Sequence, residues 1–125
     1  FGINHHIKNK EWTMNNKQFI TEEDVSKAVD VLRDTAENSA KYKAERVYLD
    51  EYRKSLKAMI MKDHLEMSVS AQEREAYASD EYQKHLRAMQ IAIEKDERQR
   101  FMRIAAEAKI EAWRSMSANY RSIKL

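Results

Sequence analysis

Apolar residues recur along two long stretches of the chain at steps of mostly three or four, which is the spacing of one face of an α-helix. The first stretch begins after Thr21, which forms a capping-box signal with Asp24, and runs to near Met67. The second begins at Asp80 and runs to near Lys124. At ~1.5 Å per residue, each helix would be roughly 70 Å long.

Each stretch has one region where the apolar stripe is weak. In the first, only alanines line the stripe between residues 36 and 44. In the second, the polar run EKDERQR separates Ile93 from Phe101. We interpret this run as a solvated segment or a stutter in the packing, and we expect both helices to continue through their weak regions.

The connector between the two stretches, from Ser68 to Asp80, reads SVSAQEREAYASD. Ser70 and Glu73 form a second capping-box pair in it, which predicts a short helix from Ala71 to Ala78. Two helices of equal length with a short connector fold back on each other. The sequence therefore predicts a long antiparallel helical hairpin.

The charges at the two ends of the hairpin indicate how its helices pair. Residues 22–37 are mainly acidic and residues 98–124 are mainly basic, so an antiparallel pair places opposite charges side by side. A turn centred near residue 74 would bring Leu49 close to Arg98.

Composition supports the same fold class. The chain has 125 residues, enough for one domain, with one glycine, no proline and 35% charged residues. Such a chain lacks the turn formers that antiparallel sheets need and is typical of long helices or coiled coils. We therefore expect an all-α fold in which residues 21–125 form a coiled-coil-like hairpin domain with a short connector helix.

Both helices carry more apolar residues than one hairpin seam needs, which indicates a further packing partner. The simplest partner is a second copy, and two hairpins would form a homodimeric four-helix bundle. The alternative is that the amino-terminal segment covers this surface. The additional apolar residues are Val29, Tyr42, Tyr48, Met61, Ile91, Met102, Ile110 and Trp113.

The amino-terminal segment, residues 1–20, shows no clear helical or strand period, and we expect it to be flexible. Met14 opens a more usual protein start than Phe1 does, so we expect Met14 to be the natural start. The one argument for docking of this segment is Trp12, because a large aromatic side chain can pack on the rest of the fold.

Several classes of protein are disfavoured by the pattern. No apolar stretch approaches the roughly 18 residues that span a bilayer, and residues 1–20 lack the apolar core of a secretory signal. The chain has no cysteine, which removes disulfides, thiolate nucleophiles and cysteine zinc sites. We expect a cytoplasmic protein without a membrane partner.

We also expect no enzyme activity, no cofactor and no metal. The chain lacks the glycines of a phosphate-binding loop, and two bare helices offer no cleft for paired carboxylates. His64 and His85 approach each other in the hairpin and could hold a metal with Asp63 or Glu66, but their spacing matches no zinc motif. Partly buried or surface histidines explain them better.

Two surfaces are candidates for binding a partner. The hairpin tip presents Gln72, Glu73, Arg74 and Tyr77, either as a protein-recognition site or as helix caps and local salt bridges. The carboxyl-terminal half is basic and contains aromatic residues, so it could contact nucleic-acid phosphates. The acids of the first helix should neutralise much of that charge. The basic candidates are Arg98, Arg100, Arg103, Lys109 and Arg114.

Three runs of the chain also carry a resemblance: AERVYL at residues 44–49, AQEREAYA at residues 71–78 and IEAWR at residues 110–114. Residues 40–115 resemble a family of small helical proteins from tailed bacteriophages and prophages. The resemblance implies an accessory protein of a phage early or recombination region, in the cytoplasm of a bacterial host. It transfers no catalytic residue.

The leading interpretation is a phage-type accessory protein that acts by protein–protein contact through its helical hairpin. Its expected partners are a second copy of the chain and another phage or host protein. The alternative is a nucleic-acid-binding accessory of phage recombination or replication.

Overall fold

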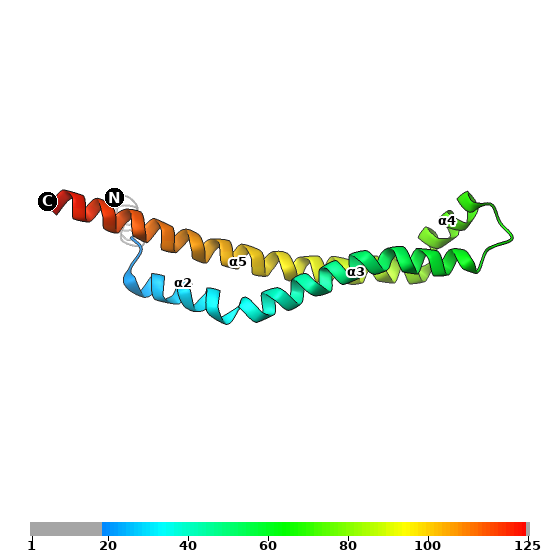
Figure 1. Cartoon of the computed structure of the whole chain (residues 1–125), viewed down its shortest axis with the longest axis horizontal. Coiled ribbons are helices and arrows are strands. Elements are labelled where there is room, and N and C mark those ends of the chain that lie inside the picture. Colours follow the sequence, from blue (N-terminus) through cyan, green and yellow to red (C-terminus); the bar gives the residue numbers. More distant parts are fainter. Residues whose placement is uncertain (1–18, 125) are drawn as a thin grey trace, which may run out of the picture. The chain divides into compact units, whose positions relative to one another are not determined.

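A computed structural model describes residues 19–124, which form four helices and no strand (Figure 1). The all-α prediction is confirmed. Residues 1–18 and Leu125 lie outside the described part of the chain, and with them most of the expected flexible segment and the expected start at Met14. The helices are α2 (Glu22–Asp34), α3 (Ala36–Lys62), α4 (Val69–Ala78) and α5 (Asp80–Lys124).

The start of α2 is the capping box that the sequence predicts. The backbone N–H of Asp24 donates to Thr21 Oγ1 at 3.1 Å, and the backbone N–H of Thr21 donates to Asp24 Oδ2 at 3.0 Å. These bonds satisfy two backbone donors at the start of the helix, where donors lack partners within the helix. The hydrogen bonds from Thr21 also hold the pKa of the Asp24 carboxyl below its usual value.

The first long helix is interrupted at Thr35, which belongs to neither α2 nor α3. The prediction of one helix from Glu22 to near Met67 is therefore wrong. Threonine is β-branched and a weaker helix former than alanine or glutamate, which follow it. The three alanines of the expected stripe between residues 36 and 44 are exposed, so no buried stripe supports the helix through this region.

The described chain divides into two compact units. Unit 1 combines residues 19–34 with residues 102–124, and so contains α2 and the carboxyl-terminal part of α5. Unit 2 comprises residues 35–101 and contains α3, α4 and the first part of α5. Each unit has its own buried residues.

The core of unit 2 takes one residue from each of three helices. Ile60 of α3, Ala76 of α4 and Tyr82 of α5 form a buried cluster, and Leu56 and Met61 pack against it. Ala76 is 0% exposed. The shared cluster holds α4 against α3 and the start of α5.

The core of unit 1 is smaller. Its buried side chains are Ala28 of α2 and Ala106 of α5, which are 3% and 4% exposed. Burial of an alanine removes little apolar surface from water, so these residues contribute modestly to stability. Arg103 of α5 adds a polar contact within the unit, because it donates to the carbonyl of Leu32 in α2 at 2.8 Å.

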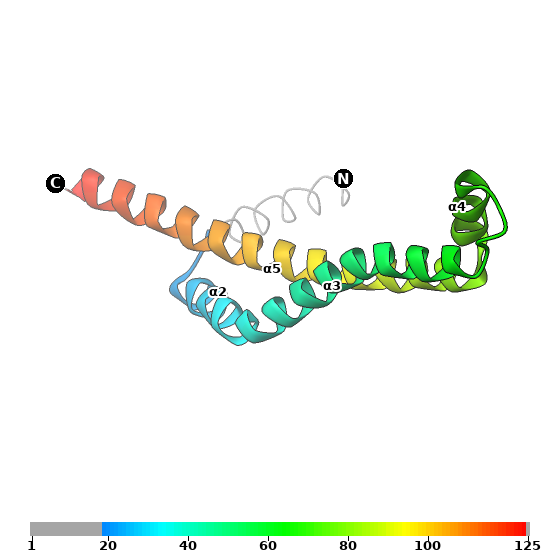
Figure 2. The same ribbon diagram turned by 45° about the vertical axis from the view of Figure 1, so that its right-hand side comes forward.

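Within unit 2, α3 and the first part of α5 lie side by side in both views (Figure 1 and Figure 2). His85 Nε2 lies 2.6 Å from the carbonyl oxygen of Leu49, and Ser39 Oγ donates to Gln99 Oε1 at 3.4 Å. Residue numbers along α5 therefore rise as those along α3 fall. Because Leu49 contacts His85, the predicted placement of Leu49 beside Arg98 is wrong.

The register differs because the chain reverses earlier than expected. α3 ends at Lys62, not near Met67, and α5 begins at Asp80, so the midpoint between them is residue 71 and not 74. At the end of α3, the backbone N–H groups of Asp63 and His64 donate to carbonyls three residues back, at 3.0 Å. Such bonds tighten and close the last turn of a helix.

The start of α4 also lies earlier than predicted, at Val69 and not Ala71. Ser68 caps the helix, because its Oγ accepts a hydrogen bond from the backbone N–H of Ala71 at 3.2 Å. The backbone of Ser68 has the extended geometry of a cap, with φ −64° and ψ 158°. Ser70 lies inside the helix, so the predicted capping pair of Ser70 and Glu73 is wrong.

The second long helix agrees with its prediction. α5 is one helix of 45 residues from Asp80 to Lys124, and the polar run between Ile93 and Phe101 does not break it. The hydroxyl of Ser79 accepts a hydrogen bond from the backbone N–H of Tyr82 at 3.1 Å and so caps its start.

Candidate functional site

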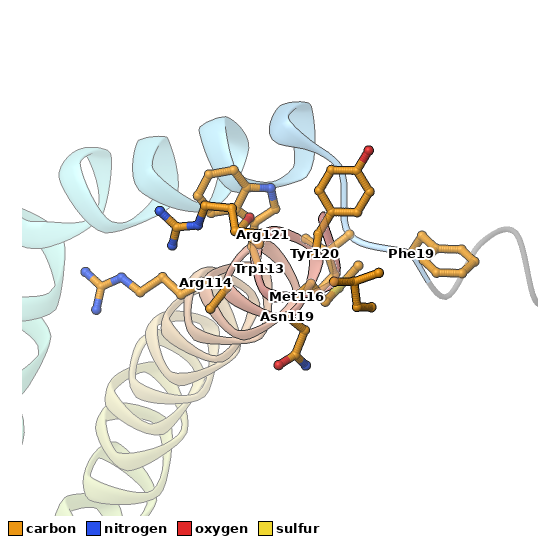
Figure 3. A pocket seen from close by; sticks show the side chains of 11 residues that line it. Phe19, Trp113, Arg114, Met116, Asn119, Tyr120 and Arg121 are labelled. Atoms are coloured by element: carbon orange, nitrogen blue, oxygen red, sulfur yellow. The ribbon is translucent and has the colours of Figure 1, made fainter. Parts of the chain in front are cut away.

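Unit 1 carries an apolar groove between the segment before α2 and the last turns of α5 (Figure 3). The groove has a volume of ≈ 930 Å³. Phe19 lines it on one side, and Trp113, Met116 and Tyr120 of α5 line it on the other. Trp113 and Met116 are half-buried, whereas Phe19 and Tyr120 are 63% and 59% exposed. The groove therefore presents aromatic side chains to solvent.

Two arginines of α5, Arg114 and Arg121, also line the groove. Figure 3 shows both side chains extending to the same side of α5, away from Phe19. Arg114 lies 3.5 Å from Glu111, and both side chains of this pair are 70% exposed. A surface ion pair of this kind contributes little free energy, so Arg114 stays available to a partner carboxylate.

The predicted interaction tip lies in α4, and its candidate residues differ in their contacts and exposure. Gln72 is 9% exposed and donates through Nε2 to the carbonyl of Met67 at 2.9 Å. Glu73 lies 3.3 Å from Nζ of Lys57 in α3. Arg74 is exposed. Gln72 and Glu73 thus hold α4 in place, and Arg74 faces solvent.

Tyr77, the fourth tip residue, links α4 to both neighbouring helices. Its ring centroid lies 4.8 Å from Nζ of Lys57 and 5.2 Å from the ring of Tyr82, edge to face. Tyr77 and then Glu73 raise the pKa of Lys57 above its ordinary value, so this lysine is charged at neutral pH. Tyr77 is also 44% exposed, which leaves part of its ring open to a partner.

The basic residues considered for nucleic-acid binding are divided between the two units. Arg98, Arg100 and Arg114 each pair with a glutamate three or four residues away in α5, at 2.8, 2.6 and 3.5 Å. Arg103 donates to a backbone carbonyl of α2, and Lys109 is exposed. Intrahelical carboxylates therefore offset part of the positive charge of this segment.

Three acidic residues of α2 form ion pairs within α2, namely Glu23, Asp30 and Asp34. Arg33 lies 2.8 Å from Asp30 and 3.1 Å from Asp34. Across unit 1, Lys109 of α5 is one of the smaller causes that lower the pKa of Asp24. The expected attraction between the acidic and basic helices is thus weak in unit 1.

No protein-family model, curated protein or solved structure matches the chain. Within residues 19–124, no helix is both long and apolar enough to cross a membrane.

A polar contact between α3 and α5 was not indicated by the sequence pattern. Arg46 Nη1 lies 3.0 Å from Asp96 Oδ2 and 2.9 Å from Glu97 Oε1. The two carboxylate side chains are 16% and 29% exposed. Hydrogen bonds from Arg100 first, and from Arg46 second, lower the pKa of Glu97.

This contact changes one part of the interpretation of the run EKDERQR as a solvated segment or a stutter. Glu94, Lys95, Arg98 and Arg100 are exposed, but Asp96 and Glu97 are half-buried. Asp96 and Glu97 follow Ile93 by three and four residues, so they continue its face of α5. That spacing is the signal by which the sequence could have shown the contact. It places acids on the face that meets α3, where Arg46 pairs with them.

The two histidines considered for a metal site have separate surroundings. His64 lies in the turn after α3, with Nδ1 3.9 Å from Glu66 Oε1. His85 contacts the Leu49 carbonyl, and its ring centroid lies 5.6 Å from that of Tyr52. Among the described residues, no three histidine, aspartate or glutamate side chains are grouped to hold a metal ion. His85 thus belongs to the packing of α3 on α5.

Proposed function

We propose that this chain is a non-catalytic accessory protein that acts by protein–protein contact, and that the groove of unit 1 binds a second copy. The observation that carries the proposal is the exposure of apolar side chains at this groove. Phe19, Tyr120 and Ile123 are 63%, 59% and 84% exposed. Large contiguous apolar patches are rare on monomeric proteins and often mark interaction sites.

Charge complementarity favours a second copy as the occupant. α2 begins with the exposed acids Glu22 and Glu23, and the groove near this start carries Arg114 and Arg121. A two-fold contact is self-complementary, because each copy offers both halves of the interface. The acidic start of α2 in one copy would therefore face the basic rim of the other.

We extend the proposal to the whole chain as a hairpin in which α2 and α3 run antiparallel to α5. Two such hairpins would form a four-helix bundle, with the apolar residues that lie off each hairpin seam at the contact. Exposed large apolar residues on α2, α3 and α5 support this arrangement. They include Val29, Tyr48, Ile91 and Met102, which the sequence places off the seam.

We further propose a phage-type origin, supported by the resemblance of residues 40–115 to phage and prophage proteins. A cytoplasmic location in a bacterial host would follow from that origin. The genes that flank the coding sequence test this part: neighbours from a phage early or recombination region support it. Neighbours with no relation to phage genes contradict it.

Light scattering over a range of protein concentrations tests the dimer. We expect twice the single-chain mass of 14.8 kDa for the wild-type chain. Ile123→Lys places a like charge beside the arginines of the groove and should return the single-chain mass. Ser122→Lys is the matched control, because Ser122 is exposed and does not line the groove. A mass of 14.8 kDa at every wild-type concentration contradicts the proposal.

Nucleic-acid binding is the second candidate, and one contact favours it. Phe101 is 58% exposed, and the guanidinium of Arg100 lies 4.7 Å from its ring centroid. An exposed aromatic ring beside an arginine suits base stacking with a nearby phosphate contact. Binding to single-stranded DNA that weakens steeply with salt and with Arg100→Gln would support this candidate. Absence of binding at low salt would remove it.

A further inference from the structure

A second pocket lies in unit 2, where α3, α4 and the start of α5 meet. Its volume is ≈ 370 Å³. α3 supplies Arg53, Lys54 and Lys57, Tyr77 comes from α4, and Tyr82 comes from α5. The other lining residues are apolar, so three cations line one small space whose wall contains no carboxylate.

Each of the three cations has a carboxylate nearby that does not line the pocket. Lys54 Nζ lies 3.2 Å from Glu51, and Lys57 Nζ lies 3.3 Å from Glu73. The four side chains of these two pairs are between 27% and 70% exposed. Ion pairs this exposed contribute little free energy, so a carboxylate from a partner can replace either glutamate.

Arg53 differs from the two lysines. Its Nε is buried and is the one buried side-chain donor without a hydrogen-bond partner among residues 19–124. Asp50 Oδ1 lies 3.7 Å from Arg53 Nε, which is beyond hydrogen-bonding distance. A buried donor without a partner destabilises the free protein. An acceptor in the pocket would remove this penalty once the Arg53 side chain, which is 42% exposed, turns its Nε toward the acceptor.

We propose that this pocket binds a carboxylate side chain from an acidic, partly apolar peptide segment of a protein partner. A carboxylate accepts hydrogen bonds from several donors at once, which suits Arg53 Nε together with Lys57. The carbon atoms of the bound side chain would pack on Tyr77 and Tyr82. The inference rests on the proposed function of protein–protein contact, and it names the chemistry of a partner other than a second copy.

The size of the pocket favours a peptide side chain over a nucleic acid. A volume of ≈ 370 Å³ is near the lower end of the range of roughly 300–1,000 Å³ that ligand pockets occupy. Nucleic-acid backbones bind along extended basic surfaces. The pocket also includes Tyr77, one of the residues predicted for the interaction tip, which connects the pocket to the exposed face of α4.

Fluorescence anisotropy with the full chain tests the inference. The probe is a labelled short peptide in which Glu and Leu alternate, and the matched probe has Gln in place of Glu. We expect the Glu peptide to bind at least about tenfold more tightly, because Gln is neutral and cannot form ion pairs with Arg53 and Lys57. Arg53→Gln should weaken binding of the Glu peptide by a similar factor.

The control variant is Lys43→Gln, which removes an exposed cation of α3 outside the pocket and should change binding less than about twofold. Far-ultraviolet circular dichroism confirms that each variant keeps its helices. In the wild-type chain, the ¹⁵N NMR signal of the Arg53 Nε–H group should shift when the Glu peptide is added. The signal is assigned by its loss in Arg53→Gln.

Equal binding of both peptides, or unchanged binding in Arg53→Gln with an unmoved Arg53 signal, would overturn the inference. An equal shift with inorganic phosphate would assign the pocket to free anions and also overturn it. Light scattering on the same samples separates the two proposals. A dimer that does not bind the Glu peptide removes this inference alone, whereas a monomer that does not bind it contradicts both.

Discussion

Units 1 and 2 both consist of helices, but they bury different amounts of apolar surface. Unit 2 adds α4, and its cluster of Ile60, Ala76 and Tyr82 draws on three helices. Unit 1 pairs α2 with part of α5 and buries the small side chains of Ala28 and Ala106. Two helices alone enclose little apolar surface. In unit 2 the short third helix, α4, increases the apolar surface that is buried. The comparison indicates that unit 2 is better stabilised by its own contacts than unit 1, which is the unit for which we propose a partner.

The largest expected difference between the units is in the free energy of unfolding after truncation of one isoleucine in each. Ile60→Ala removes a side chain that is 7% exposed and should lower the free energy of unfolding by about 2–5 kcal/mol. Ile104→Ala in unit 1 removes one that is 46% exposed and should cost less than about 1 kcal/mol. Urea unfolding followed by circular dichroism, at one low protein concentration, measures both. Equal losses would show that the two cores do not differ as described.

The next largest expected effect concerns the cap of α4, the helix that unit 2 has and unit 1 lacks. Ser68→Ala removes the acceptor for the Ala71 N–H and should destabilise α4 by about 1 kcal/mol. Ser70→Ala, inside the helix, should change stability by less than about 0.5 kcal/mol. Hydrogen exchange of the α4 amides reports the effect locally. A larger loss of stability in Ser70→Ala than in Ser68→Ala would contradict the cap at Ser68 and support the predicted capping pair of Ser70 and Glu73.

The smallest expected effect is a dependence on pH that involves one carboxyl in each unit. The folded-state pKa values of Asp24 and Glu97 lie below their ordinary values of 3.8 and 4.5. A lowered pKa contributes stability that is present above the unfolded-state pKa and is lost as the pH falls through the folded-state pKa. We therefore expect the contribution of Glu97 to disappear as the pH drops below about 4.5.

Carboxyl NMR titration of the variants identifies the cause of the Glu97 shift. Arg100→Gln should raise the pKa of Glu97 more than Arg46→Gln does, because the hydrogen bond from Arg100 is its largest cause. The pKa of Asp24 should stay the same in both variants, since its largest cause is Thr21. A Glu97 pKa that does not move in Arg100→Gln would contradict the assignment.

The parts of the fold that sequence reasoning predicted correctly depend on local signals. The capping box of Thr21 and Asp24 and the uninterrupted α5 each follow from residues close together in the chain. The break at Thr35 was not predictable in this way. Periodicity shows that a stripe exists, but not whether another helix covers it, and the alanines after Thr35 are exposed.

The candidate surfaces were predicted only in part, for the same reason. The sequence indicates that Trp113 is an apolar residue beyond those that the hairpin seam needs, and Trp113 lines the groove of unit 1. The pocket of unit 2 combines Arg53 and Lys57 with Tyr77 and Tyr82, which come from three helices. These residues come together only once the early end of α3 and the position of α4 are known.

The central claim is that a second copy covers the groove of unit 1, and thiol accessibility tests it directly. The chain has no cysteine, so Asn119→Cys places a single thiol in the groove, and Ser122→Cys places one outside it. The measurement is the rate of reaction with a water-soluble maleimide as protein concentration rises. We predict that the Asn119→Cys thiol reacts more slowly at higher concentration, while the Ser122→Cys thiol reacts at a constant rate. Concentration-independent rates at both sites would contradict the claim, and slow reaction of Asn119→Cys at every concentration would instead indicate a cover from the same chain.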